Sequence, residues 1–180
     1  MNINFEGTLE TLAKEIHAFN VDKGWWDDYP VKTDRFDTAM MLVTSELSES
    51  MEGCRKNLMD DKVPQYRMFD VELADAMIRL LDLAGAYEIE TFGRSSAVDT
   101  EPLIDSTQPE QLWHIVKMLG YTTVMRSESS AIHFGVLLVQ AVANHNDIDL
   151  KSIIKAKMEF NNVRPDHLRE NRAKENGKKF

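Results

Sequence analysis

Two short acidic motifs, separated by one polar break, constrain the fold more than any other feature of the chain. Glu46-Leu-Ser-Glu49 and Glu72-Leu-Ala-Asp75 each space two carboxylates at i and i+3, so each pair lies on one helix face. The 22 residues between the motifs have a polar stretch, residues 59–64, near their middle. An antiparallel helical hairpin that turned there would bring the two pairs level and facing each other. Four carboxylates at one point repel strongly unless a cation lies among them.

Apolar residues recur at helical spacing along the chain, and neither arm of the hairpin alternates as a strand would. Thr8 and Asp149 are expected N-caps. Thr107 and Glu110 fit a capping box, and Gly120 is expected to end the helix that follows it. The predicted helices cover about residues 8–20, 37–57, 65–88, 107–120, 130–144 and 149–162. The sequence therefore predicts an all-α fold, a helical bundle built around the hairpin.

The length of 180 residues and the mass of 20.6 kDa favour a single domain over residues 1–180. Within it we expect a linker or excursion at about residues 90–128, with a polar part at 93–106, and a basic C-terminal tail at 165–180. The helix predicted at 130–144 is apolar almost all round, which indicates a buried element or a subunit interface. We therefore expect a homodimer, with a tetramer as an alternative.

The net charge of −9 is unevenly distributed. The last thirty residues carry nine Lys and Arg against four Asp and Glu, so residues 1–150 hold a charge of −14. An acidic body argues against polymeric nucleic acid as the partner, whereas a basic end suits a small phosphorylated ligand. No apolar run reaches the roughly 18 residues of a membrane span. The N-terminus lacks signal-peptide features, and one cysteine excludes an internal disulfide framework, so we expect a cytoplasmic protein without a membrane partner.

The ordinary interpretation of one Glu-x-x-Glu is a solvated helix face, and two observations argue against it here. The pairs are level across one predicted hairpin, and apolar residues such as Leu47 and Leu73 flank them. Asp82 also follows the second motif by two turns on the same face. Carboxylates in an apolar interface are costly unless a cation compensates them. The predicted metal ligands are Glu46, Glu49, Glu72 and Asp75.

The types of ligand select the metal. Sites built from oxygen alone suit Mg²⁺, Mn²⁺ or Ca²⁺, whereas a four-helix di-iron site normally takes Glu-x-x-His on two helices. Neither pair contains histidine, and none of the five histidines has a partner at ligand spacing. Mg²⁺ is the expected ion, with Mn²⁺ as an alternative, and substrate phosphate and water would complete its coordination. Such a site suits cleavage of a phosphoanhydride.

Two longer strings carry a resemblance to a known family. Residues 44–52 (T-S-E-L-S-E-S-M-E) and 71–82 (V-E-L-A-D-A-M-I-R-L-L-D) are similar to the two motif helices of the MazG-like all-α nucleoside triphosphate pyrophosphohydrolases. That superfamily includes the dimeric dUTPases, the dCTP pyrophosphatases and the phosphoribosyl-ATP pyrophosphohydrolases. The close match covers about residues 38–87, with a looser one at the N-terminal helix and at residues 157–161.

The resemblance implies hydrolysis of a nucleoside or deoxynucleoside triphosphate between its α and β phosphates, giving monophosphate and pyrophosphate. It implies that the four motif carboxylates hold one or more Mg²⁺ ions. Glu49 and Glu46 are the catalytic candidates, and Glu49 is the one that we expect to orient or deprotonate the attacking water. The base and the sugar of the substrate stay open.

Further candidates for substrate binding lie outside the two acidic pairs. Lys157, Asn161 and Arg164 share one face of the last predicted helix and suit phosphate oxygens. The resemblance to the family implies this role for a Lys and an Asn late in the chain. Arg79, on the second motif helix, is also expected to bind substrate. The alternative for the late helix is a solvated polar face.

An aromatic loop at residues 21–30 is the candidate base site. Trp25 or Trp26 would stack on the base, and Lys23 would approach a phosphate. Asn20 or His17 would read the base edge. The alternative is that the two tryptophans cap the core.

Two other functions stay open. One is a non-catalytic helical regulator that keeps the acidic cluster as a structural metal or ligand site. The other is a ferritin-like di-iron protein, which the missing histidines disfavour.

Overall fold

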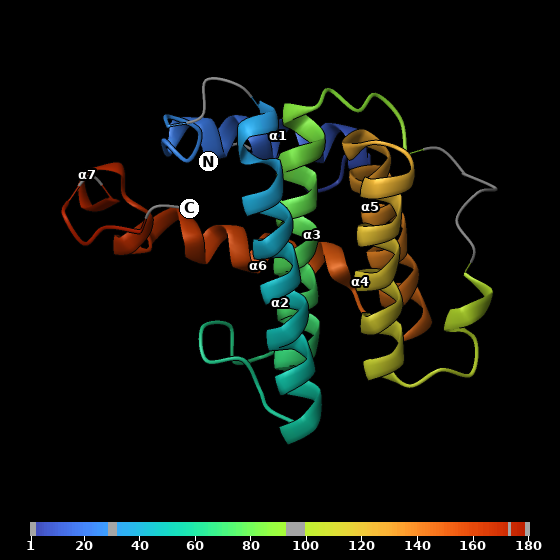
Figure 1. Cartoon of the computed structure of the whole chain (residues 1–180). Coiled ribbons are helices and arrows are strands. Elements are labelled where there is room, and N and C mark those ends of the chain that lie inside the picture. The colour runs from blue at the N-terminus through green and yellow to red at the C-terminus, as the bar shows by residue number, and fades with distance from the viewer. Residues whose placement is uncertain (1–2, 29–31, 93–99, 173, 179–180) are drawn as a thin grey trace.

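The computed structural model describes residues 3–28, 32–92, 100–172 and 174–178, and its regular structure is helical (Figure 1). Over these residues no β-strand forms, so the predicted all-α class is confirmed. None of the helices in this part of the chain is both long and apolar enough to cross a membrane. The helices are α1 (Leu9–Asp22), η1 (Lys32–Arg35), α2 (Phe36–Lys56), α3 (Met68–Ala86), η2 (Glu101–Leu103), α4 (Gln108–Met125), α5 (Glu128–His145), α6 (Leu150–Val163), η3 (Pro165–His167) and α7 (Arg169–Arg172).

Helices α2 and α3 pack side by side as an antiparallel pair at the centre of the molecule (Figure 1). Asn57 ends α2 in the left-handed region, at φ 51°, and its backbone N–H donates to the Cys54 carbonyl. The Ser50 hydroxyl donates to the Phe69 carbonyl at 2.9 Å and fixes the register of the two helices. In this register Glu46 of the first motif lies near Glu72 and Asp75 of the second.

The loop between these helices is longer than the predicted polar break. The Asp60 carboxylate accepts a hydrogen bond from the Val63 backbone N–H at 2.7 Å, and an isolated antiparallel bridge pairs Met59 with Arg67. These contacts hold the chain in a loop up to Arg67. Helix α3 therefore begins at Met68 rather than at the predicted residue 65.

Helix α3 is the central element of the fold. Helix α1 packs along it, α6 crosses it, and α4 and α5 form a second antiparallel pair beside it (Figure 1). Most residues of α3 are consequently buried, including Glu72. The predicted caps at Thr8 and Asp149 form, as does the capping box of Thr107 with Glu110.

One predicted helix end is wrong, because α4 does not stop at Gly120 but continues to Met125. A side chain at Gly120 would meet only open space. The buried stripe of Ile115 and Leu119 continues through Thr122, so packing outweighs the roughly 1 kcal/mol cost of a glycine within a helix.

The apolar helix predicted at residues 130–144 is buried inside the chain, as α5. It packs against α3 and α4, which accounts for its apolar character on the faces toward these two helices. Several large apolar side chains elsewhere remain exposed, and four of them lie on α4: Trp113, Tyr121, Val124 and Met125.

The excursion expected at about residues 90–128 and the basic tail expected at 165–180 have different structures. Of the excursion expected at about 90–128, residues 93–99 lie outside the described residues, and most of the remainder is α4. The described part of the basic tail folds back toward the aromatic loop through η3 and α7. The Arg172 guanidinium lies 3.5 Å from the centre of the Trp25 ring and donates to the Lys23 carbonyl at 3.1 Å. The C-terminal segment is thereby anchored to the N-terminal part of the chain.

The close approach of α1 to α3 gives a test of the fold. A methyl group at Gly85 would lie 2.5 Å from the Ala13 carbonyl oxygen and 2.4 Å from the His17 Cβ atom. Gly85→Ala is therefore expected to lower the free energy of unfolding by about 1–3 kcal/mol in urea denaturation. Gly120→Ala is the matched control, since it adds the same methyl group in open space and should raise the stability by up to about 1 kcal/mol. Equal effects of the two changes would contradict this packing.

Candidate functional site

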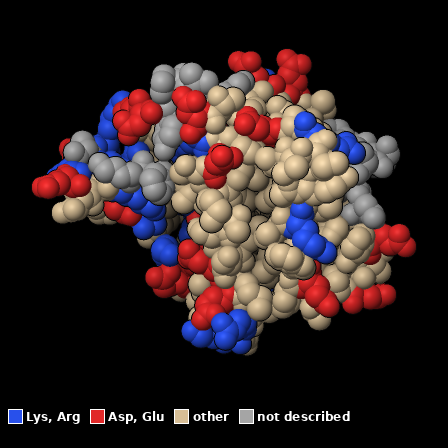
Figure 2. Space-filling view, in the orientation of Figure 1, with Lys and Arg blue, Asp and Glu red and all other residues tan. Residues whose placement is uncertain are grey.

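A cavity of about 370 Å³ lies along the α2–α3 hairpin and is bordered by α1, α6 and the C-terminal segment. One end of it is lined by the acidic motifs and by cations, and the other end is lined mainly by apolar side chains of α1, α2 and α3. Figure 2 shows the corresponding surface: Lys and Arg side chains lie beside Asp and Glu on the side of α6 and the C-terminal segment.

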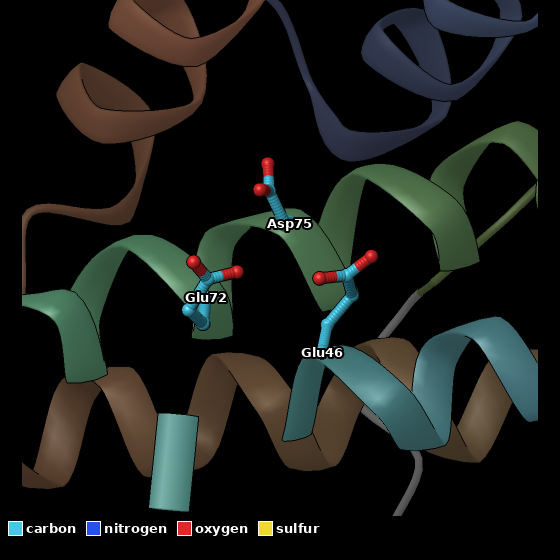
Figure 3. A group of neighbouring side chains, drawn as sticks. All are labelled: Glu46, Glu72 and Asp75. Atoms are coloured by element: carbon cyan, nitrogen blue, oxygen red, sulfur yellow. The ribbon is translucent and has the colours of Figure 1, made fainter. Parts of the chain in front are cut away.

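Three carboxylates form a cluster at the acidic end. Oxygen atoms of Glu46, Glu72 and Asp75 all lie within 4.8 Å of one another. Figure 3 shows that Glu46 comes from α2 and the other two from α3, and that they project to the same side of the hairpin. Glu46 is 7 % exposed and Glu72 is 2 % exposed. Glu49, the fourth predicted ligand, is exposed and lies outside this cluster, but it lines the same cavity.

Two cations neutralise part of this negative charge. Lys157, on α6, is 2 % exposed and donates to Asp75 at 2.7 Å. Arg79, one turn beyond Asp75 on α3, donates to Glu46 at 2.6 Å. Three carboxylates therefore share two direct cation partners, and Glu72 has neither of them.

The uncompensated negative charge changes the pKa of Glu72. Burial, followed by the neighbouring charge of Asp75, raises the pKa of Glu72 to about 8. Burial also raises the pKa of Asp75, although Lys157 acts in the opposite direction. Without a further cation, the cluster binds a proton in the pH range where an ordinary carboxyl group is ionised. A divalent ion would replace that proton.

The predicted phosphate-binding residues also meet at the cavity. Lys157, Asn161 and Arg164 all line it, and so does Arg79. The Asn161 side-chain oxygen is buried and has no hydrogen-bond partner within the described part of the chain. A buried acceptor without a donor is destabilising by about 1–3 kcal/mol, so this atom is suited to accept from a ligand or from a water bound with it.

Of the three candidate residues in the aromatic loop, Trp25 lines the cavity, whereas Trp26 and Lys23 do not. Trp25 lines the cavity, with Asn20 beside it in the lining. Trp26 is not part of the lining: its indole N–H donates to Asp82 at 3.0 Å. Lys23 is also outside the lining, and its ammonium group donates to the Asn162 carbonyl at 3.1 Å. The structure therefore gives Trp26 and Lys23 supporting positions rather than direct access to the cavity.

Several lining residues carry no local signal in the sequence. Lys62 comes from the loop between the hairpin arms, and burial, which lowers its pKa, is outweighed by the carboxylates of Asp61 and Glu72, so its pKa is raised. His167 and Lys178 come from the C-terminal segment. Burial, followed by the charges of Lys178 and Arg164, lowers the pKa of His167 to about 4, so this imidazole is neutral at pH 7. A basic tail was predicted, but only the three-dimensional fold places these side chains at the cavity.

Comparisons of the chain with protein-family models, with curated proteins and with solved structures found no match. The geometry of the cavity and the chemistry of its side chains are therefore the basis for any functional assignment.

Proposed function

We propose that the protein hydrolyses a nucleoside or deoxynucleoside triphosphate between the α and β phosphates, with Mg²⁺ as cofactor, to give monophosphate and pyrophosphate. The observation that carries this proposal is the cluster of Glu46, Glu72 and Asp75 within 4.8 Å, in a cavity that also presents cations. Carboxylates alone would suit many metals. Carboxylates beside cations suit a metal that binds together with phosphate oxygens.

The residues of the cluster fit a divalent metal ion. Glu46, Glu72 and Asp75 would hold it, and the raised pKa of Glu72 marks the place where positive charge is lacking. When bound, Mg²⁺ neutralises phosphate charge and lowers the pKa of a coordinated water. Mn²⁺ has similar ligand preferences and is expected to substitute for it.

The cations around the cluster would hold the phosphate chain. Arg79 and Lys157 already donate to carboxylates of the cluster, so they lie next to the proposed metal. Lys62, Arg164 and Lys178 line the same cavity and extend the positive charge away from the carboxylates. Such an arrangement orients a triphosphate and stabilises the charge that develops on the leaving pyrophosphate.

Glu49 is proposed as the general base. It lines the cavity, it is exposed, and it is not committed to the cluster of three carboxylates. A carboxylate in that position can hold a water and accept its proton as the water attacks the phosphoanhydride. Glu46, which Arg79 holds at 2.6 Å, is assigned to the metal and to positioning.

The expected homodimer and cytoplasmic location belong to the same proposal. Apolar side chains exposed on α4, namely Trp113, Tyr121, Val124 and Met125, offer a surface for a second copy. Helix α5, for which the sequence also allowed a subunit interface, packs against α3 and α4 within the chain.

Glu49→Gln provides the direct test of the reaction. This change keeps the size of the side chain and removes its basicity, so we expect kcat to fall by about 10²–10⁴-fold. Glu52→Gln is the matched control: Glu52 lies on the same helix, pairs with Arg55 at 3.0 Å and is not part of the cavity lining. Release of pyrophosphate and monophosphate from a panel of nucleoside triphosphates, with Mg²⁺ and with EDTA, is the measurement.

Three results of this assay would separate the hypotheses. Pyrophosphate release that requires Mg²⁺ and is lost in Glu49→Gln supports the proposal. Nucleotide binding without turnover would indicate the non-catalytic regulator. Orthophosphate and diphosphate as products would retain an enzyme but place cleavage at the other phosphoanhydride.

The raised pKa of Glu72 predicts how stability changes with pH in the metal-free protein. Between pH 4.5 and about 8 the unfolded chain loses this proton while the folded chain keeps it, so the free energy of unfolding falls as pH rises. The fall is at most about 1.4 kcal/mol per pH unit and ends above pH 8. Glu72→Gln should remove it, and the variant should be more stable than the wild type at pH 8 in thermal denaturation with EDTA.

Mg²⁺ gives the complementary result. At pH 8 the ion should raise the melting temperature of the wild type and raise that of Glu72→Gln much less, because the variant lacks one ligand. Glu52→Gln should behave as the wild type does. A wild type whose melting temperature ignores both pH in this range and Mg²⁺ would contradict the assignment of the cluster as a metal site.

A further inference from the structure

The end of the cavity opposite the acidic cluster contains a buried carboxylate that the proposed reaction does not use. Asp82, on α3, is 6 % exposed and lines the cavity. The lining around this end includes apolar side chains of α1, α2 and α3: Phe19, Ala39, Leu42, Ile78 and Leu83. A charged side chain in such surroundings requires hydrogen-bond donors.

Two donors from behind the cavity wall hold one oxygen of this carboxylate. His17 Nδ1 lies 2.8 Å from Oδ1 of Asp82, and the indole N–H of Trp26 donates to the same oxygen at 3.0 Å. Among the described residues, the other oxygen, Oδ2, has only the longer contact of 3.3 Å to that indole. An ionised carboxylate offers about four acceptor positions, so Oδ2 retains capacity to accept from a ligand in the cavity.

The distance between the two ends suits a nucleotide. Asp82 follows Asp75 by seven residues of continuous α-helix, a rise of about 10.5 Å at 1.5 Å per residue. A nucleotide whose phosphates lie at the acidic cluster would therefore place its base among the apolar residues near Asp82. Asn20 lines the cavity as well and adds an amide that can both donate and accept.

We propose that Asp82 selects nucleotides whose base carries an amino group. This inference rests on the proposed function, which gives the position of the phosphates. Adenine, cytosine and guanine present an exocyclic NH₂ donor on the edge that would face the carboxylate. Uracil and thymine present a carbonyl oxygen where cytosine has its amino group. That oxygen would face a negative charge, and uracil or thymine could reach Oδ2 only by shifting to use the neighbouring N3–H, which disfavours these bases.

The test is a binding measurement that needs no turnover. Calorimetric titration of the wild type with AMP, CMP, GMP and UMP, in EDTA and again with Mg²⁺, gives the affinity for each base. CMP and UMP are the critical pair because they differ at the amino and carbonyl groups. We expect CMP to bind roughly 10- to 100-fold more tightly than UMP, the range that one hydrogen bond to a charged acceptor supplies.

Asp82→Asn tests the residue itself. The amide keeps the size of the side chain and an acceptor for Trp26, but it places an NH₂ donor where Oδ2 was, so the preference for CMP should disappear or reverse toward UMP. Asp22→Asn is the matched control: Asp22 is exposed at the end of α1 and is not part of the lining. Circular dichroism establishes that each variant is folded.

The outcomes separate this inference from the proposed function. Equal binding of CMP and UMP by the wild type, tighter binding of UMP, or no binding of any monophosphate would overturn the role of Asp82, and these results do not require a folded variant. Hydrolysis of CTP and UTP with equal kcat/KM would also overturn it and would leave the pyrophosphohydrolase assignment intact. A preference for CMP that Asp82→Asn removes, in a protein without turnover, would support the inference and refute the proposed reaction.

Discussion

The ion pair between Lys157 and Asp75 joins α6 to the central α2–α3 hairpin. A lysine that is 2 % exposed is costly to bury without a partner, and a carboxylate beside two others is costly without a cation. Each group therefore requires the other, and α6 must cross the hairpin at that level. Held at that level, α6 and the C-terminal segment contribute Lys157, Asn161 and Lys178 to the lining of the cavity.

The same contact limits what the acidic cluster can be. Lys157 and Arg79 together bring two positive charges to three carboxylates, so the cluster is short of one positive charge rather than three. A small hard cation with open coordination positions fits that deficit, and anionic ligands can fill those positions. Purely acidic clusters of this size would instead favour a closed site such as that of calcium.

The hairpin could be predicted from the sequence because its signals are local: acids at i and i+3, apolar residues at helical spacing and a polar break between them. Helical spacing predicted that three polar residues would share one face, and all three line the cavity: Lys157, Asn161 and Arg164. Which tryptophan reaches the cavity could not be predicted, since adjacent residues point in different directions and only the partner of Trp26, Asp82, decides between them. The presence of Lys62 and Lys178 in the cavity lining could not be predicted either, because a loop and a tail have no periodic pattern. The same limit explains the error at Gly120, where tertiary packing outweighs a local preference.

The register contact between Ser50 and Phe69 spans 19 residues, whereas Lys157 and Asp75 are 82 positions apart in the chain. Closing the longer loop costs more chain entropy, so the hairpin, which holds its own Arg79–Glu46 pair, has the kinetic advantage during folding, and compensation of Asp75 by Lys157 comes later. Until α6 arrives, the two motifs repel each other across the forming helix pair. Dissolved divalent cations would reduce that repulsion, so we expect the rate of folding itself to be sensitive to the ions in the surrounding medium.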